Sequence, residues 1–431
     1  MLRDGWNTLG LIRTALASSH WPPQRLRRVQ EDQLHKLLVH VYQNVPLYRA
    51  LYDEAGFRPE QFRSLDDLDK IPILQKQRLK AARPEEVVMR GVAPRLCPTV
   101  DTSGSTGTPL RIYLGPRDQR WQRAVAWRIL FEHGFRWTDR TLEIRMTLGQ
   151  RFFIQRFGIA PKEWVSILDP PESWARRLTE TRPQVVVAGA GTLHALAEAI
   201  ASLGLKPARP RIVVSDSETL TPGTRRLVHH VLGTDPVEVF GLVELSNFAW
   251  ECEHRHGFHV SADSHIVEVD APSGEPGPII ATALGMWTMP MIRYQTGDLA
   301  ESESRPCPCG RSLPLLRRIY GRAVDSVVLP GGGKLFWPFF HEVLGRYSEL
   351  RQWRVLQEDT RHLRLQVSTF SKSADLLARI EADLRRALPG EVVLQVECVE
   401  TIPWVPGEKI RMVISRCSAT QESPHGKFIN E

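Results

Sequence analysis

Residues 173–204 read SWARRLTETRPQVVVAGAGTLHALAEAIASLG, and this stretch decides the fold. A helix-like run, 173–182, precedes the strand-like run QVVVAGA, and a second helix-like run, 192–204, follows it. The alternation continues through the strand-like RIVVSD (211–216), the helix-like TPGTRRLVHHVLG and the strand-like VEVFG (237–241). Strands and helices that alternate in this way predict an α/β fold with a parallel sheet covered by helices. Ligands of such sheets bind outside the carboxyl ends of the strands, where the segments AGAG, SDSET and FGLVE lie.

The composition is that of an ordinary globular protein. The chain has 431 residues, 42% of them hydrophobic and 24% charged, and this length favours two domains over one. A net charge of +7 suits anionic ligands. No nucleic acid is expected, because the basic clusters lack the interleaved aromatic residues of a stacking platform. Six cysteines are too sparse for a disulfide scaffold in a chain of this length.

The start of the chain contains apolar residues that Asp4 and Arg13 interrupt. No apolar run reaches the roughly 18 residues of a membrane span. We therefore expect no signal peptide, no transmembrane segment and a cytoplasmic location, with weak attachment to a membrane surface as the open alternative.

The sequence pattern changes after about Gly321. Two strand-like runs, a helix and a further strand follow the glycine-rich segment PGGGK. The helix within 374–388 places Leu377, Ile380, Leu384 and Leu388 on one face. This pattern predicts a compact α+β module of about a hundred residues.

Residues 101–110, DTSGSTGTPL, are rich in glycine and hydroxyl side chains. Exposed backbone N–H groups and hydroxyls suit phosphate oxygens, and a plain surface turn is the alternative. The segment is not the P-loop of nucleoside triphosphatases, because Gly107 precedes Thr108-Pro109 where that motif has Gly-Lys-Ser/Thr. A phosphate held here would need positive charge from elsewhere in the chain.

Three of the cysteines accompany histidines. Cys252 begins CEHRHGFHV, and Cys307 and Cys309 form CPCG further along the chain. Thiolate and imidazole ligands are the set that structural zinc uses. Because Cys-x-Cys is less specific than Cys-x-x-Cys, free thiols are the alternative.

The order of motifs resembles the adenylate-forming ligases, and specifically the phenylacetate-CoA ligase family with its capsular-polysaccharide relatives. The resemblance extends over nearly the full chain. Its segments are LHKLLVHVYQNVPLYRALYDEAGF, SLDDLDKIPIL, TSGSTGTPL, VFGLVEL, RYQTGDL, CPCGR, IYGRAVD and PGEKIRMV. It implies an N-terminal adenylation domain, 1–321, with the ATP and acid sites, and a small mobile α+β lid domain, 322–431, with the catalytic lysine.

Enzymes of this family let a carboxylate attack the α-phosphorus of Mg-ATP, which gives an acyl-adenylate and pyrophosphate. A thiol, usually that of coenzyme A, then displaces AMP. The resemblance implies this reaction here, with an aryl acid such as phenylacetate as the family default. Because the first step brings two anions together, the site must supply positive charge and hydrogen-bond donors.

The family motifs assign the nucleotide contacts. Phe240 and Gly241 would lie against adenine, and Glu244 would bind Mg²⁺ unless it is an exposed helix-cap residue. Asp298 would accept hydrogen bonds from the ribose hydroxyls. The remaining contacts are the phosphate loop, Thr102, Ser103, Gly104, Ser105, Thr106 and Gly107, and the adenine-pocket segment, Ser217, Glu218 and Thr219, for which a helix N-cap is the alternative.

Three residues are assigned to charge neutralisation at the reacting groups and to movement of the lid domain. Arg322 would hold ribose and phosphate, and Asp325 would be the hinge of the lid domain, with a turn residue as the alternative. Lys409 would neutralise the carboxylate and the α-phosphate as they react, with a solvated surface lysine as the alternative. Glu408 separates Gly407 from Lys409, which departs from the family pattern.

The resemblance also selects the fourth zinc ligand. His259 follows Gly257-Phe258 as the family's histidine follows its glycine, and His254 and His256 are the alternatives. A closed set of four ligands would stabilise a loop and take no part in catalysis. The expected set is Cys252, His259, Cys307 and Cys309.

The sequence leaves the acid and the acceptor open. The expected partners are a small-molecule carboxylic acid, ATP and coenzyme A. An amine, a hydroxyl or a carrier protein is the alternative acceptor, because the activation residues would be identical. A non-catalytic binding protein that keeps the fold is a further alternative, which Glu408 suggests, and a homodimer is an alternative to a monomer.

Overall fold

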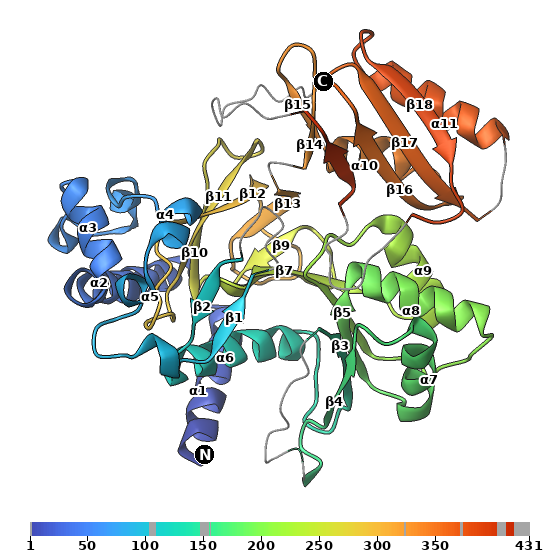
Figure 1. The fold of residues 1–431 in the computed structure, drawn as a ribbon. Helices are drawn as coiled ribbons and strands as arrows, with labels where there is room; N and C mark the ends of the chain where they lie inside the picture. The colour runs from blue at the N-terminus through green and yellow to red at the C-terminus, as the bar shows by residue number, and fades with distance from the viewer. Residues whose placement is uncertain are drawn as a thin grey trace. The chain divides into compact units, whose positions relative to one another are not determined.

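The structure is a computed structural model that describes residues 2–102, 109–146, 155, 157–322, 325–370, 374–402 and 411–417. The chain forms two compact units. Unit 1 consists of Met1–Phe135 and Val239–Ile319, and unit 2 consists of Arg136–Glu238 and Tyr320–Glu431. Figure 1 shows the helices and strands of both units with their labels.

Unit 1 combines N-terminal helices with antiparallel strands. In α2 the buried residues Leu34, Leu37, Leu38 and Val41 recur at helical spacing, and the helix ends before Val45 because Pro46 follows. These side chains join the strands in one hydrophobic core. The helices are α1 (Leu2–Ser18), α2 (Pro23–Asn44), α3 (Pro46–Glu54), η1 (Pro59–Gln61), η2 (Leu65–Lys70), α4 (Lys76–Ala81), α5 (Pro84–Val87), η3 (Pro94–Leu96) and α6 (Pro116–Glu132).

The strands of unit 1 form a hairpin and a larger sheet. The hairpin pairs β1 (Thr99–Asp101) with β2 (Arg111–Tyr113). In the larger sheet the strand order is β10-β11-β12-β13-β9-β8-β7. Its members are β7 (Val237–Leu242), β8 (Ser246–Glu251), β9 (Phe258–Val260), β10 (His265–Val269), β11 (Pro276–Ala283), β12 (Tyr294–Glu303) and β13 (Leu315–Arg322).

Unit 2 contains the parallel sheet. β5 (Val185–Gly189) pairs in parallel with β6 (Ile212–Asp216) and with β3 (Thr141–Arg145), and β3 pairs in parallel with β4 (Lys162–Ser166). β5 is almost wholly buried, as expected for a parallel strand that helices cover. Figure 1 shows these helices in green beside β3 and β5. They are α7 (Pro171–Thr181), α8 (Ala190–Ser202) and α9 (Pro222–Leu232).

Strand β7 contributes residues to both units. Its first residues pair in parallel with β6, and its last residues pair antiparallel with β8. The register shifts between Phe240 and Gly241. A side chain at Gly241 would place a Cβ 2.6 Å from the Cα of Asn247, so this position requires glycine.

The C-terminal part of unit 2 has a hydrophobic core of its own. Its four-stranded sheet has the order β18-β17-β16-β19. The buried Gln357 joins this sheet to the preceding hairpin, because its amide group bonds the backbone N–H and C=O of Val328 at 2.9 and 2.7 Å. The elements are β14 (Ser326–Val328), β15 (Lys334–Phe336), α10 (Trp337–Leu344), β16 (Leu350–Gln357), β17 (His362–Thr369), α11 (Ala374–Ala387), β18 (Val393–Cys398) and β19 (Val413–Ser415).

The structure confirms the α/β class and the parallel sheet predicted from residues 173–241. The buried face of α11 consists of Leu376, Ile380 and Leu384, whereas Leu377 is only partly buried. No helix among the described residues is both long enough and apolar enough to cross a membrane.

We predict that Gly285→Ala destabilises unit 1. A Cβ at Gly285 would overlap the indole ring of Trp121, which is itself buried in the core. Overpacking of this kind costs about 1–3 kcal/mol. Gly10→Ala is the matched control, because a Cβ at this exposed position of α1 meets no atom within 4 Å among the described residues. Urea unfolding of the two variants measures the difference, and equal midpoints would contradict the prediction.

Candidate functional site

The two ends of the glycine-rich loop lie in the β1–β2 hairpin. The Thr102 N–H donates to the Leu110 carbonyl, and the Leu110 N–H donates to Thr102 Oγ1, both at 2.9 Å. Arg111, the cation nearest in sequence, forms an exposed ion pair with Asp101 at 2.9 Å. Thr102 therefore joins the two ends of the loop. The other predicted phosphate contacts, Ser103, Gly104, Ser105, Thr106 and Gly107, lie outside the described residues.

Glu244 lies in the turn between β7 and β8 and is 2% exposed. Its Oε1 accepts hydrogen bonds from Lys76 Nζ at 2.9 Å and from the Tyr294 hydroxyl at 3.0 Å. Burial acts to raise the pKa of Glu244, but the Lys76 ammonium outweighs this effect and the pKa is lowered. The carboxylate is thus ionised at neutral pH, which a metal ligand requires.

Lys76 is a site residue that the sequence analysis missed. It begins α4, two residues after Leu74, whose backbone bonds Arg293 O at 2.9 Å and the Gln295 N–H at 3.0 Å beside β12. This backbone pairing places Lys76 next to Glu244. The only signal in the sequence was its place just after the family segment SLDDLDKIPIL.

Phe240 and Asp298 lie on strands of unit 1. Phe240 is half-buried and packs edge-on against Phe248, with 5.3 Å between the ring centroids. Asp298 is buried in β12, and its backbone N–H donates to Thr296 Oγ1 at 3.1 Å. Gly297 has a left-handed backbone, with φ +79°, within this strand.

Ser217, Glu218 and Thr219 follow β6 in unit 2. Ser217 is exposed and has a left-handed backbone with φ +67°. The Glu218 side chain accepts a hydrogen bond from the Gly191 N–H, in the first turn of α8, at 2.7 Å. Asp216, which ends β6, forms a two-point ion pair with Arg145 at 2.7 and 2.6 Å. Arg145 is a second residue that the sequence analysis did not single out.

Arg322 ends β13, and Asp325 lies just before β14. Asp325 Oδ1 accepts hydrogen bonds from Arg411 Nε at 2.7 Å and from a terminal guanidinium nitrogen of Arg411 at 2.5 Å. The predicted hinge residue is therefore tied to the chain just after Lys409. Lys409 itself lies outside the described residues.

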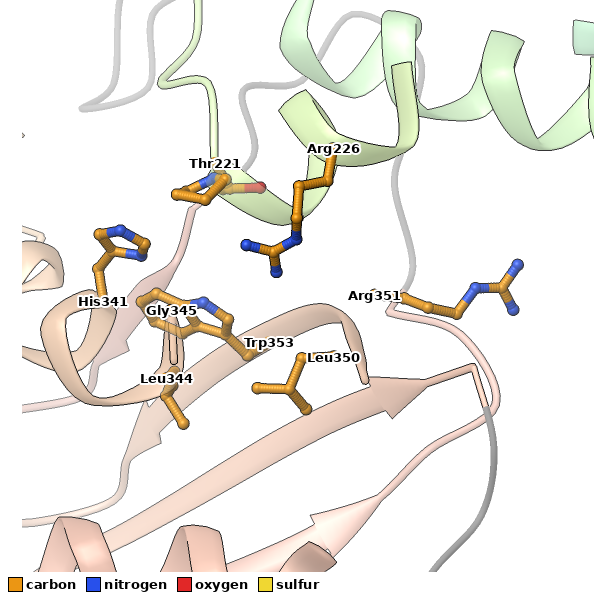
Figure 2. Close-up of a pocket in the computed structure, with 10 residues that line it drawn as sticks. Thr221, Arg226, His341, Leu344, Gly345, Leu350, Arg351 and Trp353 are labelled. Carbon is orange, nitrogen blue, oxygen red and sulfur yellow. The ribbon is translucent and has the colours of Figure 1, made fainter. Parts of the chain in front are cut away.

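A small pocket in unit 2 lies apart from these residues. Figure 2 shows Arg226 extending from α9 toward Trp353 in this pocket. Its volume of about 10 Å³ holds a single water molecule. Gly223 allows the close packing here, because a Cβ on it would lie 2.7 Å from the Arg351 carbonyl oxygen. The pocket is too small for a nucleotide or an acyl group.

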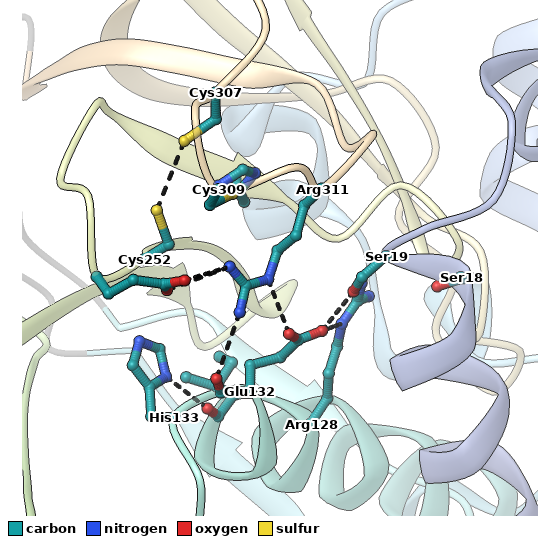
Figure 3. Close-up of polar contacts among 12 residues, drawn as sticks. Ser18, Ser19, Arg128, Glu132, His133, Cys252, Cys307, Cys309 and Arg311 are labelled. Atoms are coloured by element: carbon teal, nitrogen blue, oxygen red, sulfur yellow. Dashed lines mark hydrogen bonds and ion pairs between the residues drawn. The ribbon is translucent and has the colours of Figure 1, made fainter.

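The predicted zinc ligands come together in unit 1. The ligand atoms of the four residues lie within 4.8 Å of one another, and three of the four residues are buried. Figure 3 shows Cys252 Sγ facing Cys307 Sγ at 3.6 Å, and Cys309 Sγ lies 3.3 Å from His259 Nε2. His254 and His256, the alternatives, are exposed and are not part of the group.

Burial has different effects on the protonation of the residues in this cluster. Burial lowers the pKa of His259 to about 4, so its imidazole is neutral at pH 7. Burial raises the pKa of Cys307 to about 12 in the metal-free protein. For Cys309 burial is outweighed by hydrogen bonds from Arg311, and the pKa of the thiol is lowered. Three sulfurs and one neutral imidazole are a donor set that tetrahedral zinc prefers.

Arg311 links the cluster to helices α6 and α1, as Figure 3 shows. Its guanidinium donates to Glu132 Oε2 at 2.9 Å and to Glu253 at 3.2 Å. Ser312, the next residue, donates its backbone N–H to the Ser19 carbonyl at 2.8 Å. The segment that carries Cys307 and Cys309 therefore also holds the end of α1.

The chain is similar to known proteins in sequence and in fold. The chain is 30% identical over 336 residues to the phenylacetate-coenzyme A ligase of Thermus thermophilus, covering 72% of this chain and 73% of that protein. It is 27% identical over 362 residues to the phenylacetate-coenzyme A ligase of Aromatoleum evansii, covering 78% of each. The structure of a 2-hydroxyisobutyryl-CoA ligase in complex with 2-HIB-AMP matches with a TM-score of 0.78 at 21% identity, covering 92% of this chain and 91% of that one, which shows the shared fold. No protein-family model matches the chain.

We predict that Lys76→Met destabilises the protein at neutral pH by about 3 kcal/mol, because the buried Glu244 carboxylate loses its charged partner. Lys80→Met, an exposed position of the same helix, is the control and should have little effect. The pKa of Glu244 is lower in the folded protein than in the unfolded chain. The ionised carboxylate therefore stabilises the folded state at pH values above its unfolded pKa, and this stabilisation is lost as the pH falls through its folded pKa. The difference in unfolding free energy between Lys76→Met and wild type, measured with urea, should therefore be smaller below pH 4 than at pH 7. A constant difference would contradict this account.

Proposed function

Because the chain belongs to the phenylacetate-coenzyme A ligase family, we propose that it activates a carboxylic acid with ATP and transfers the acyl group to coenzyme A. The observation that carries this proposal is the sequence relationship, which extends over nearly three quarters of both chains. The protein is an AMP-forming acid–thiol ligase. An aryl acid is the substrate class that the names of the relatives favour.

The first step, acyl-adenylate formation, requires charge at the phosphates. A carboxylate attacks the α-phosphorus, so negative charge accumulates where two anions meet. When bound together with ATP, Mg²⁺ would supply positive charge there. Glu244 is the residue that would bind it, since Mg²⁺ takes one or two carboxylates and completes its shell with phosphate and water. Lys76 keeps that carboxylate ionised and fixed in position.

The other chain residues bind and orient the substrates. Thr102 to Gly107 would hold the leaving phosphates with backbone and hydroxyl donors. Asp298 would accept hydrogen bonds from the ribose, and Phe240 with Gly241 would lie against adenine. Arg322 would contact ribose and phosphate. Ser217, Glu218 and Thr219 would complete the adenine pocket.

Two residues serve the change between the half-reactions. Asp325 would be the hinge about which the domain 322–431 moves relative to the domain 1–321. Lys409 would approach for adenylation and withdraw before the thiol attacks. The ion pair between Asp325 and Arg411 supports this assignment, because it connects the hinge residue to the segment that carries Lys409.

We propose that Cys252, His259, Cys307 and Cys309 hold a structural zinc ion. The donor set fits, since four ligand atoms converge and the imidazole is neutral. When bound, zinc supplies a fixed tetrahedral cross-link. All four positions would be filled by protein, so the ion would not reach the substrates. The bound ion would stabilise the end of α1, because Arg311 and Ser312 connect the segment of Cys307 and Cys309 to it.

The central test mixes the protein with Mg-ATP and a panel of aryl, aliphatic and amino acids. We expect pyrophosphate release with at least one acid, and a coenzyme A thioester by mass spectrometry once coenzyme A is added. Lys409→Ala should lower pyrophosphate release about 100-fold, as expected when a single group that stabilises developing charge is removed. Lys334→Ala, a lysine in β15 outside the family motifs, is the control.

The outcomes separate the alternatives. No pyrophosphate with any acid would indicate a binding protein that keeps the fold. Pyrophosphate without a coenzyme A thioester would indicate an amine, a hydroxyl or a carrier protein as the acceptor. Unchanged release by Lys409→Ala would remove that lysine from the site.

Metal removal tests the zinc proposal. We expect about one zinc per chain by elemental analysis. Cys309→Ser should lose the metal, whereas Cys97→Ser, a cysteine outside the cluster, should retain it. Stripping the metal with a chelator should speed hydrogen exchange at Ser18–Trp21, because Ser312 holds this segment. Exchange in β16 and β17 should stay unchanged. Zinc-free native protein, or equal exchange with and without metal, would refute the proposal.

A further inference from the structure

A charged pair lies at the carboxyl ends of the parallel strands of unit 2. Arg145 ends β3 and Asp216 ends β6, and β5 runs between these two strands. The guanidinium contacts both carboxylate oxygens, at 2.7 and 2.6 Å. The ion pair therefore spans the end of β5, where Gly189 is the register partner of Asp216. This edge is where ligands of parallel α/β sheets bind.

Asp216 begins a turn with an unfavourable backbone. Ser217 has φ +67°, a backbone conformation that residues other than glycine rarely adopt. Its hydroxyl donates to Asp216 Oδ1 at 3.1 Å, and the Glu218 N–H donates to the Asp216 carbonyl at 2.8 Å. A strained residue persists only where its surroundings hold it, and such residues gather at ligand sites.

The turn is held from two sides. On one side Arg145 fixes the Asp216 carboxylate, to which Ser217 is bonded. On the other side the Gly191 N–H holds the Glu218 carboxylate at 2.7 Å. Ser217 lies between these two anchors and is exposed, and Thr219, which follows the second anchor, is half-exposed, so both remain accessible to a ligand.

We propose that Arg145 is a positioning residue for ATP, which acts through Asp216 to hold the segment Ser217–Thr219 in its nucleotide-binding shape. The inference rests on the proposed function, in which this segment contacts adenine. Arg145 contributes without touching the nucleotide itself.

The geometry explains why arginine occupies this position. A guanidinium presents two parallel N–H donors that match both oxygens of a carboxylate, whereas a lysine ammonium is a single point charge. Asp216 is buried, and burial alone would raise its pKa, yet the pKa is lowered because Arg145 outweighs burial. Without the guanidinium the carboxylate would have to protonate or move toward water. Movement takes the acceptor away from the Ser217 hydroxyl, and protonation replaces the charged acceptor with a weaker neutral one.

The test compares four forms of the full-length protein: wild type, Arg145→Met, Arg145→Lys and the control Arg176→Met on the exposed face of α7. Isothermal titration with ATP gives the dissociation constant, and steady-state kinetics give KM for ATP and for the acid. We expect Arg145→Met to weaken ATP binding by roughly tenfold while KM for the acid at saturating ATP stays within about twofold. Arg145→Lys should fall between Arg145→Met and wild type, and Arg176→Met should match wild type.

Each other outcome overturns the inference. If Arg145→Met and Arg145→Lys bind ATP as wild type does, the positioning role is wrong while the proposed function stands. If affinity for ATP and for the acid falls equally, together with the unfolding temperature, Arg145 has only a general structural role. If Arg145→Met does not fold, an unchanged ATP affinity of Arg145→Lys decides against the proposal. If wild type binds no ATP, the proposed function fails, and the inference fails with it.

Discussion

A buried carboxylate must be paired, and the candidate site of unit 1 depends on this constraint. Glu244 is almost wholly buried, and an isolated charge there would be costly. Lys76 and the Tyr294 hydroxyl both bond its Oε1, which links the β7–β8 turn to α4 and β12. The same bonds that stabilise the fold keep the carboxylate ionised and oriented. The carboxylate that we propose as the Mg²⁺ ligand is therefore held in position by the protein's own side chains.

The same constraint shapes unit 2. The Asp216 carboxylate lies at a strand end, and Arg145 pairs both of its oxygens. This pairing holds Ser217 in a left-handed conformation that its own preferences oppose. At both places a charge pair contributes to the shape of a loop. In unit 2 this arrangement suits a binding segment, because Ser217 stays exposed.

The segment between β12 and β13, which carries two residues of the cysteine–histidine cluster, is also held by polar contacts. The ligand atoms of the cluster converge, and Arg311 extends the contact to Glu132 of α6. Arg128, which is 1% exposed, bonds Ser19 at 2.8 Å in the same network. Figure 3 shows that these polar groups connect the cluster to the end of α1. The zinc ion that we propose would cross-link irregular backbone in this segment.

The sequence by itself determined the parallel sheet, the family and which four cysteine and histidine residues cluster, because these depend on local periodicity and on short sequence motifs. It did not identify Lys76 or Arg145. Their partners, Glu244 and Asp216, lie 168 and 71 residues away along the chain. Nor did it reveal the antiparallel strands of unit 1, whose pairing joins segments such as Leu315 and His259. Only the tertiary structure decided these contacts, because the pairing of buried charges depends on which distant strand ends the fold brings together.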